Sequence, residues 1–449
     1  MFTRVLVANR GEIAVRIIRA LREARIEAVA VYSTADAGAL HTRLADRAVC
    51  VGPPAAAASY LNMASVIAAA ETTGCEAIHP GYGFLAENPA FVRACEENDL
   101  VFIGPGAEVM ERMGDKARAK RELAAAGVPL VPGAETASPA EARAAANDVG
   151  FPVLLKARAG GGGKGMRLVE DEAALGDAYA RASSEALAAF GDGRLYLEKA
   201  IDPARHVEIQ VLADADGGVL TLGERECSIQ RRHQKLIEES PSAAVDDELR
   251  ASMEEAVARA CLQIGYVNAG TFEFLLGSDG SFYFIELNAR LQVEHPVSEL
   301  ITGIDIVREQ LRIADGAPLA ATGHAPHRGH AIEVRINAED PSRNFAPSPG
   351  TIIRFRAPLG PGVRVDTHVE DGTSIPPHYD SLIAKLIVWD ESRSAAIERC
   401  LRALRELDLE GVATTRDAAI EIVGTDAFRS GSYSTGFLGE TRLDAVRVE

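Results

Sequence analysis

The sequence predicts an α/β protein whose first hundred residues form a parallel sheet. Short aliphatic runs at residues 5–8, 28–31, 77–78 and 101–103 are separated by segments with helical periodicity, the first at residues 12–25. This alternation of strand and helix is typical of parallel βαβ units. The chain has 449 residues, which is enough for two to four domains with real hydrophobic cores.

The composition excludes several functional classes. The formal net charge of −18 at pH 7 argues against a general nucleic-acid or anionic-membrane surface. The six cysteines form no CxxC pair, so neither a zinc site nor disulfide bonds are predicted. No apolar run reaches membrane-spanning length, and the first residues enter a strand directly. These observations predict a cytoplasmic protein that binds no nucleic acid and no membrane, with a small substrate or a protein partner that tolerates acidic surfaces.

The remaining segments follow in order along the chain. A helix is expected at residues 107–126, because a Gly-Val-Pro sequence then breaks the helical pattern. Residues 153–197 are interpreted as strand, glycine loop, strand, helix and strand, a unit small enough to be a mobile lid. A core that carries candidate catalytic residues is expected at residues 205–312. A mixed domain follows, with a helix near residues 393–407.

A glycine-rich segment at residues 160–165 separates two predicted strands, so it is interpreted as a hairpin tip. Its bare amides and Lys164 could wrap a polyphosphate. It is not a P-loop, because Lys164 is followed by Gly-Met where that motif needs Ser or Thr and a helix. A simple flexible turn is the alternative. Lys156 favours a phosphate site, because this lysine interrupts an otherwise apolar strand and an anion would offset its burial.

Apolar and polar residues alternate without exception from Glu286 to Glu294. If this run is extended, one face holds carboxylate, amide and guanidinium groups. The preceding segment is predicted to form a β-hairpin that turns at residues 279–280. A two-residue loop there places Glu273 directly opposite Glu286, whereas a four-residue loop leaves them diagonal on the same face. A cation between the two carboxylates would relieve their repulsion, and hard oxygens suit Mg²⁺ or Mn²⁺. A solvated strand face is the alternative.

Other segments carry groups that could bind a nucleotide. Glu198 and Lys199 end a predicted strand whose edge could offer backbone groups to an adenine, while Ile201 would pack on its face. His206 lies on an alternating strand, for which a plain surface strand is the competing interpretation. A basic cluster at residues 227–235 is a candidate anion site, with a solvated loop as the alternative.

Several short motifs occur together in one order. They are ANRGEIA at residues 8–14, HPGYGFL at 79–85, MGDK at 113–116, the glycine loop at 160–165, RHVEIQ at 205–210, QRRHQK at 230–235, ELNARLQVEH at 286–295 and EVRINAED at 333–340. In these motifs the chain resembles the biotin carboxylase component of biotin-dependent carboxylases, a branch of the ATP-grasp superfamily. The resemblance covers essentially the full length.

The resemblance implies three domains and two half-reactions. Residues 1–112 would form a Rossmann-like (pre-ATP-grasp) domain, residues 113–330 an ATP-grasp core with a mobile lid at about 131–204, and residues 331–449 a mixed C-terminal biotin carboxylase domain. ATP would phosphorylate bicarbonate to carboxyphosphate, and the released CO₂ would be captured by N1′ of biotin. Phosphoryl transfer of this kind needs charge neutralisation and in-line alignment more than covalent help.

The resemblance also implies roles for residues of this sequence. The implied ATP-binding residues are Lys116, Lys156, Gly161, Gly162, Gly163, Lys164, Gly165, Glu198, Lys199, Ile201, His206, Gln230 and His233. The implied ligands of Mg²⁺ or Mn²⁺ are Glu273 and Glu286, with Asn288 adjacent.

The implied bicarbonate site consists of Arg290, Gln292 and the amide of Val293. A guanidinium fork such as that of Arg290 matches a planar oxyanion. Glu294 would be the base that deprotonates bicarbonate, and Lys235 would steady carboxyphosphate. Arg335 would stabilise the enolate of biotin by preorganised electrostatics.

Three positions depart from the family pattern. Lys164 stands where arginine is common, Ala86 stands where serine is common, and Pro361 replaces a larger apolar residue at the dimer interface of the family. Other interface positions match, namely Arg19, Glu23 and Arg364. A homodimer is therefore expected.

The partners are inferred from what the sequence lacks. It contains no Met-Lys-Met biotinylation sequence and ends at Glu449, so biotin is expected on a separate biotin carboxyl carrier protein, with the carboxyltransferase on separate chains. Acetyl-CoA, as in fatty acid biosynthesis, is the usual acceptor for a free-standing chain of this kind, and propionyl-CoA, other acyl-CoAs, pyruvate and urea are alternatives.

Two other functions stay open. One is an ATP-grasp ligase that activates a different carboxylate, such as one in purine or carbamoyl phosphate synthesis. The other is a non-catalytic assembly subunit that keeps the fold. Glu294 together with Arg335 favours biotin carboxylation over the first. The second is disfavoured by the intact set of Lys235, Glu273, Glu286, Arg290, Glu294 and Arg335.

Overall fold

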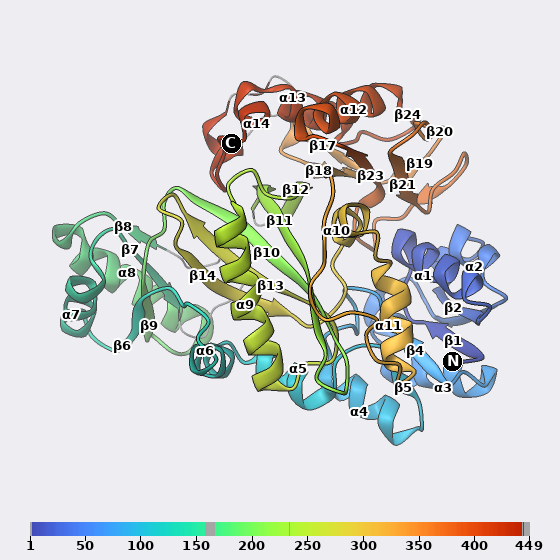
Figure 1. Ribbon diagram of the computed structural model, residues 1–449, viewed down its shortest axis with the longest axis horizontal. Helices are drawn as coiled ribbons and strands as arrows, with labels where there is room; N and C mark the ends of the chain where they lie inside the picture. Colours follow the sequence, from blue (N-terminus) through green and yellow to red (C-terminus); the bar gives the residue numbers. More distant parts are fainter. Residues whose placement is uncertain (1, 158–166, 233, 442, 444–449) are drawn as a thin grey trace.

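The computed structural model describes residues 2–157, 167–232, 234–441 and 443 (Figure 1). The N-terminal part is built on a five-stranded sheet of order β3-β2-β1-β4-β5, in which every neighbouring pair is parallel. The predicted parallel sheet is therefore confirmed. Its strands are β1 (Arg4–Val7), β2 (Glu27–Ser33), β3 (Arg47–Gly52), β4 (Ala77–His79) and β5 (Val101–Phe102). Its helices are α1 (Gly11–Glu23), α2 (Leu40–Leu44), α3 (Met63–Thr73) and α4 (Pro89–Glu97).

Both faces of this sheet are covered. Val5 and Val7 of β1 pack into one apolar cluster with α1 and with the later helix α11 (Ile306–Ala314), whereas Leu6 packs into a second cluster with α3 and α4. A strand buried on both faces has a continuous aliphatic sequence, which is why the run at residues 5–8 shows no alternation.

The helix expected at residues 107–126 is interrupted. The structure has α5 (Ala107–Gly114) and α6 (Lys116–Ala125) instead of one helix. Asp115 between them has an extended backbone, and its side chain accepts a hydrogen bond from the Arg118 amide at 3.0 Å. The carboxylate of Asp115 thus caps the second helix, and an N-cap needs a non-helical backbone.

A nine-stranded sheet forms the centre of the molecule (Figure 1). Its order is β14-β13-β10-β11-β12-β16-β23-β21, with β15 also paired to β11. The strands are β10 (Ala204–Ala213), β11 (Val219–Arg231), β12 (Gln234–Ser240), β13 (Asn268–Gly277), β14 (Phe282–Asn288), β15 (Gly323–His324), β16 (His330–Asn337), β21 (Val363–Thr367) and β23 (Leu382–Asp390). Because β12 pairs with β16, strands of the C-terminal part extend the central sheet by direct hydrogen bonding.

The other helices beside this sheet are α9 (Asp247–Ile264), α10 (His295–Thr302), α12 (Arg393–Glu406), α13 (Arg416–Gly424), α14 (Asp426–Ser430) and α15 (Phe437–Glu440). Three small two-stranded sheets complete the C-terminal part, and they pair β17 (Glu339–Asp340) with β18 (Ala346–Pro347), β19 (Gly350–Thr351) with β22 (Ser374–Ile375), and β20 (Arg354–Arg356) with β24 (Asp408–Glu410). The helix α12 confirms the helix expected near residues 393–407.

A separate small unit stands at the side of the central sheet, at the left of Figure 1. It is a four-stranded antiparallel sheet of order β6-β9-β7-β8 with two helices and its own apolar core. The elements are β6 (Gly133–Thr136), α7 (Pro139–Val149), β7 (Val153–Ala157), β8 (Arg167–Val169), α8 (Glu172–Phe190) and β9 (Leu195–Lys199). Strand, strand, helix and strand follow in the order predicted for residues 153–197.

The hairpin of β13 and β14 brings Glu273 directly opposite Glu286, as predicted. The direct pairing was expected with a two-residue loop and a diagonal arrangement with a four-residue loop, but the connection in the structure is longer than two residues. Residues 278–281 connect the strands, and the register shifts by one residue between Glu273 and Phe274. Nearer the loop, Leu276 pairs with Phe282, and that register alone would place Glu273 opposite Ile285 and Glu286 on the other face of the strand. The β-bulge adds one residue and so brings Glu286 opposite Glu273.

No helix among the described residues is both long and apolar enough to cross a lipid bilayer.

Candidate active site

A cavity of about 1020 Å³ lies where the N-terminal part, the central sheet and the C-terminal part meet. This volume is at the upper end of the range for small-molecule and cofactor sites. The predicted residues that line it are Lys116, Lys156, His206, Gln230, Lys235, Glu273, Glu286, Asn288, Arg290, Gln292, Val293, Glu294 and Arg335. Residues far apart in the sequence are therefore gathered around one space.

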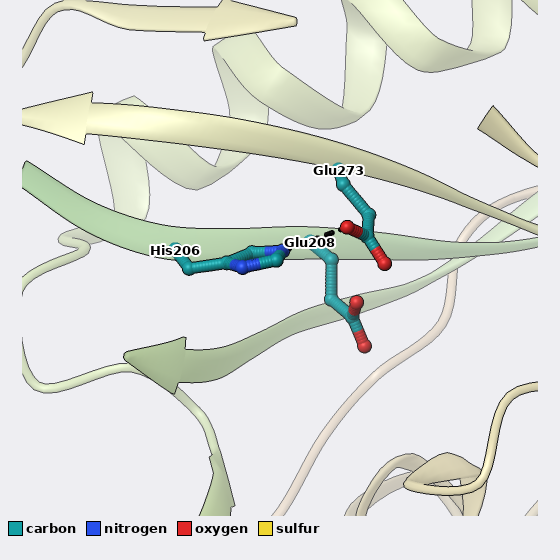
Figure 2. Close-up of side chains that lie close together, drawn as sticks. All are labelled: His206, Glu208 and Glu273. Atoms are coloured by element: carbon teal, nitrogen blue, oxygen red, sulfur yellow. Dashed lines mark ion pairs between the residues drawn. The ribbon is translucent and has the colours of Figure 1, made fainter. Parts of the chain in front are cut away.

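Glu273 is surrounded by hydrogen-bond donors. Its Oε1 accepts hydrogen bonds from Lys235 Nζ at 2.9 Å, Asn288 Nδ2 at 2.8 Å and Gln292 Nε2 at 3.0 Å. Its Oε2 lies 2.9 Å from His206 Nε2, and Figure 2 shows the two side chains pointing toward each other. Burial alone would raise the pKa of Glu273, but Lys235 and His206 hold it well below its ordinary value.

The carboxylates of Glu273 and Glu286 could together bind a divalent cation. Burial and the neighbouring Glu273 carboxylate raise the pKa of Glu286, so a cation between them would be favourable. Two facing carboxylates are hard ligands of the kind that Mg²⁺ prefers, and the amide oxygen of Asn288, which here accepts a hydrogen bond from Arg290, could add a third. Ligand atoms of His206, Glu208 and Glu273 also lie within 4.8 Å of one another (Figure 2). Glu208 thus joins a set from which the sequence analysis omitted it.

Lys235 connects three carboxylates. Its Nζ donates to Glu208 Oε2 at 2.7 Å, Glu273 Oε1 at 2.9 Å and Glu294 Oε1 at 2.6 Å. Burial would lower the pKa of Lys235, but Cys227 and the three carboxylates raise it well above its ordinary value. The ammonium therefore stays charged in a buried position, as a binding group for an anionic intermediate must.

Arg335 holds Glu294 from the other side. The Arg335 guanidinium donates from Nη2 to Glu294 Oε2 at 2.9 Å and from Nε to Glu238 Oε1 at 2.6 Å. Glu294 is fully buried. Burial would raise the pKa of Glu294, but Lys235 and Arg335 hold it well below its ordinary value. Glu294 is thus an anion between two cations, with Oε1 bonded to Lys235 and Oε2 bonded to Arg335.

A bulge in β12 positions Lys235 for its contact with Glu294. Ile229 pairs with Ile237, but the next residue, Gln230, pairs with Lys235, so Leu236 is an extra residue in β12. Residues three apart on a regular strand lie on opposite faces. The bulge turns Lys235 to the face of Glu238, so both side chains reach the group around Glu294.

Arg225 is a central residue that the sequence analysis missed. This guanidinium is completely buried and donates to Glu208 Oε1 at 2.5 Å, Gln210 Oε1 at 2.7 Å and Thr271 Oγ1 at 3.0 Å. It neutralises and orients Glu208, which in turn holds Lys235. The available signal was an arginine within a strand sequence, which burial forces to find carboxylate partners.

The run from residue 286 to residue 294 is not extended throughout, so that expectation is wrong. The strand β14 ends at Asn288, because the next amide, that of Ala289, bonds to Glu87 Oε1 at 3.2 Å and not to a neighbouring strand. The chain then turns, and Glu294 occupies the N-cap position of α10. The turn, and not a shared strand face, brings these polar groups together.

Arg290 is held in the predicted set by side-chain contacts. It donates to Asn288 Oδ1 at 2.8 Å, Gln292 Oε1 at 2.8 Å and Glu87 Oε2 at 2.9 Å. Its guanidinium therefore borders both the carboxylate set and the turn after β14. Glu87, from the N-terminal part, was not predicted.

Lys385 supports the backbone of the same turn. Its completely buried Nζ donates to the Val293 carbonyl at 2.8 Å and lies 3.4 Å from Glu12 Oε1. The sequence analysis missed Lys385, although a lysine interrupting the apolar run at residues 382–387 is the same signal that selected Lys156.

The strand that ends at Glu198 and Lys199 is not an edge, so that expectation is wrong. The strand β9 lies between β6 and β7, and the Lys199 amide bonds to the Pro132 carbonyl at 2.8 Å. Glu198 accepts hydrogen bonds from Lys156 and, at 2.6 Å, from Lys120. Their roles as nucleotide contacts, and that of Ile201, remain predictions. The predicted residues Gly161, Gly162, Gly163, Lys164, Gly165 and His233 lie outside the described residues.

Comparison with known proteins gives three successive family matches. The model for the N-terminal domain of biotin carboxylase matches residues 1–110, the model for the ATP-binding domain of the carbamoyl-phosphate synthase L chain matches residues 115–322, and the model for the biotin carboxylase C-terminal domain matches residues 333–440.

Similar proteins extend over nearly the whole chain. A biotin carboxylase of Nostoc sp. is 52% identical over 442 residues, which are 98% of this chain and 99% of that protein. A pyruvate carboxylase component of Methanothermobacter thermautotrophicus is 52% identical over 445 residues, 98% of this chain and 90% of that protein.

Solved structures agree with these relatives. A biotin carboxylase–βγ-ATP complex from Campylobacter jejuni matches with a TM-score of 0.92 at 46% identity, covering 98% of this chain and 99% of that one. The biotin carboxylase domain dimer of Hydrogenobacter thermophilus 2-oxoglutarate carboxylase, in complex with MgADP, ADP and bicarbonate, matches with a TM-score of 0.88 at 49% identity, covering 98% of each chain.

One cavity holds the facing carboxylates of Glu273 and Glu286 together with Glu294, which lies between two cations. Together with the fold and the relatives, this site defines an ATP-dependent ligase. Within that class the chain belongs to the biotin carboxylase family. The family, the fold class and the class of enzyme expected from the sequence motifs are confirmed.

Proposed function

We propose that this enzyme uses ATP and bicarbonate to carboxylate N1′ of biotin, with carboxyphosphate as the intermediate. The observation that carries the proposal is the position of Glu294, which contacts Lys235 through one oxygen and Arg335 through the other. Lys235 also contacts Glu273, a proposed cation ligand, whereas Arg335 lies on β16 in the C-terminal part. One glutamate therefore stands between the place where ATP would react and the place where biotin would react.

The nucleotide end of the cavity is proposed at Lys116, Lys156 and His206, with Gln230 and the residues near Glu198 around the adenine. The group of Glu273, Glu286 and Asn288 would hold Mg²⁺ or Mn²⁺, which supplies charge neutralisation between phosphate oxygens. The unit of β6 to β9 would close over the nucleotide as a lid. Its separate apolar core supports movement as one body.

Bicarbonate is proposed to bind between Arg290, Gln292 and the amide of Val293. Its hydroxyl proton passes to a carboxylate oxygen of Glu294, and the freed oxygen attacks the γ-phosphorus while the bond to the β–γ bridging oxygen breaks. ADP then carries the electron pair of the broken bond. Lys235 remains charged and stabilises the carboxyphosphate anion.

Biotin is proposed to react beside Arg335. Carboxyphosphate breaks into CO₂ and phosphate, the phosphate takes the N1′ proton, and N1′ then attacks the carbon of CO₂. As N1′ loses its proton, negative charge develops on the ureido oxygen, and a fixed guanidinium stabilises that enolate more than it stabilises neutral biotin. Burial would lower the pKa of Arg335, but Glu238 and Glu294 keep it well above its ordinary value, so the charge is permanent.

The domain division proposed for this chain is residues 1–112, 113–330 and 331–449. Biotin would arrive on a separate biotin carboxyl carrier protein, the carboxyltransferase would be a separate chain, and the enzyme would act as a cytoplasmic homodimer. The dimer of the Hydrogenobacter domain supports the homodimer. Arg364 donates to Glu299 and Asp366 within its own chain, so it would meet a second protomer as a fixed group.

The final acceptor is proposed to be acetyl-CoA or another acyl-CoA. The Nostoc and Methanothermobacter relatives are equally identical to this chain but belong to enzymes with different names. The identity of the biotin carboxylase chain therefore leaves pyruvate open, because the carboxyltransferase selects the acceptor.

The test uses isotopically labelled bicarbonate with free biotin and MgATP. The proposal expects label in carboxybiotin only when all three substrates are present. Label that enters a different product without biotin, or ATP turnover that needs a carboxylate other than bicarbonate, would assign the site to another ligase.

A further inference from the structure

Two buried carboxyl groups lie side by side behind Arg335. Glu238 on β12 and Glu333 on β16 are direct partners in the antiparallel register, and neither is exposed to solvent. Arg335 follows Glu333 by two residues, so it lies on the same face of the sheet. The proposed roles of the active-site residues use neither carboxyl group.

The hydrogen bonds of the pair are unequal. Glu238 Oε1 accepts from Arg335 Nε at 2.6 Å. Among the described residues, Glu238 Oε2 and both oxygens of Glu333 have no hydrogen-bond partner. Two adjacent carboxylates with a single hydrogen-bond donor between them would be very costly in a buried site, whereas one charged and one neutral carboxyl group avoid most of that cost. The proton belongs on Glu333, because Glu238 has the cationic partner.

The surrounding charges agree with this assignment. The charged groups that face the pair are Arg335 on β16, Lys385 on β23, Lys235 on β12 and Glu294 at the N-cap of α10. Burial raises the pKa of Glu333 well above its ordinary value despite Lys385. Burial and Glu294 raise the pKa of Glu238 to about 7, against the opposing effect of Arg335.

We propose that Glu333 is a positioning residue that acts as a neutral carboxylic acid, so that the Glu238–Glu333 pair holds Arg335 with a single negative charge. Arg335 is then held from behind by Glu238 and keeps its Nη2 for Glu294 and for the biotin enolate. This inference rests on the proposed role of Arg335 in the biotin half-reaction.

The consequence is a dependence of the biotin step on pH. If Glu333 loses its proton, a second negative charge lies behind Arg335 and competes with the enolate for its guanidinium. The electrostatic stabilisation of the enolate then weakens, because charge added within a few ångströms acts strongly in a buried site. Bicarbonate activation, at the Lys235 side of Glu294, would be affected much less.

The experiment compares the wild type with Glu333→Gln, which has nearly the same shape but cannot ionise. The pH profiles of two reactions are measured, biotin carboxylation and bicarbonate-dependent ATP hydrolysis without biotin. We expect wild-type biotin carboxylation to fall on the alkaline side, and we expect this limb to move upward by about one pH unit or more in Glu333→Gln. The profile of the ATP hydrolysis should stay the same.

The matched control is Glu226→Gln, which changes another fully buried glutamate of the same sheet. Glu226 contacts Arg205, Ser228 and Ser242 and not Arg335. Its pKa is also raised by burial. The alkaline limb should therefore stay in place in Glu226→Gln. An unchanged limb in Glu333→Gln, or an equal shift in both variants, overturns the proposal.

Two further measurements keep the result interpretable. Infrared difference spectra of the wild type between neutral and alkaline pH should show loss of the carbonyl stretch of a neutral carboxyl group, and its absence overturns the proposal even if Glu333→Gln does not fold. Arg335→Ala separates the two inferences. If Arg335→Ala reduces both reactions equally, the proposed role of Arg335 fails. If Arg335→Ala reduces mainly biotin carboxylation, but Glu333→Gln leaves the alkaline limb of the pH profile in place, only the role of Glu333 fails.

Discussion

The Nζ of Lys385 lies 2.8 Å from the carbonyl oxygen of Val293. This contact ties a strand of the C-terminal part to the turn that carries the proposed bicarbonate ligands. Lys385 is completely buried and lies 3.4 Å from Glu12 and 4.0 Å from Asp366. One ammonium thus joins all three parts of the chain at the edge of the active site.

Removing that ammonium should destabilise the fold. Lys385→Met leaves Glu12 and Asp366 buried with less compensation, and breaking a buried pair costs roughly 3–5 kcal/mol. The free energy of unfolding from denaturant titration checks this value. Arg43→Met is the control, because Arg43 and Glu370 form a half-exposed pair whose loss should cost less than about 1 kcal/mol. Equal losses in the two variants would contradict the account.

Glu294→Gln tests the base. The variant keeps the shape of Glu294 and should bind MgATP, because the proposed metal ligands are other residues. Bicarbonate-dependent ATP hydrolysis should fall by about 10²–10⁴-fold, the range for loss of a general base. Steady-state ADP release and nucleotide binding by calorimetry measure the two properties. Near-normal turnover would remove Glu294 from this role. Glu248→Gln, on the surface of α9, is a control that should be silent.

Arg335→Ala tests the enolate role. Biotin carboxylation should fall by about 10²–10³-fold, the loss expected for one preorganised stabilising group. Bicarbonate-dependent ATP hydrolysis should fall much less, because Lys235 and Arg290 still serve the first half-reaction. The ratio of the two rates is the measured quantity, and a ratio equal to that of the wild type would count against the assignment.

Glu239 should contribute acid sensitivity to the fold. It is buried and accepts hydrogen bonds from His330 at 2.6 Å and Arg393 at 2.7 Å. Burial would raise its pKa, but His330 and Arg393 lower it from 4.5 to about 2. Because the folded pKa is the lower one, this stabilisation is complete above pH 4.5 and disappears as the pH falls toward 2.

Unfolding titrations at several pH values measure this contribution. The wild type should lose about 2–4 kcal/mol over that window through Glu239 alone. In Glu239→Gln the slope over the window should be correspondingly smaller. Glu410→Gln, which breaks a surface pair with Arg354, should keep the wild-type slope. A slope in Glu239→Gln that matches the wild type would show that Glu239 does not carry the effect.

The sequence predicted those features that local chemistry determines. The parallel sheet followed from unbroken aliphatic runs, and the pairing of Glu273 with Glu286 followed from alternation and a turn signal. The turn itself was predicted less well, because the pairs near the loop are offset by one residue and a bulge beside Glu273 corrects that offset. Such a bulge depends on packing across the sheet and leaves no clear mark in the sequence.

Features that depend on distant contacts were not predictable. The run after Glu286 was expected to stay extended, but Glu87, some 200 residues earlier in the chain, binds the Ala289 amide and ends the strand. Likewise the strand at Glu198 gains β6 as a second neighbour and is not an edge. Arg225 was missed because its burial becomes visible only when β10, β11 and β13 are assembled.

The measurement that tests the central claim most directly is ADP release by the purified enzyme with MgATP, with and without bicarbonate and free biotin. We expect little release without bicarbonate, release when bicarbonate is added, and a further rise with biotin. ADP release that does not depend on bicarbonate, or no release from protein shown to bind ATP, would contradict the proposal that Glu294 serves both half-reactions.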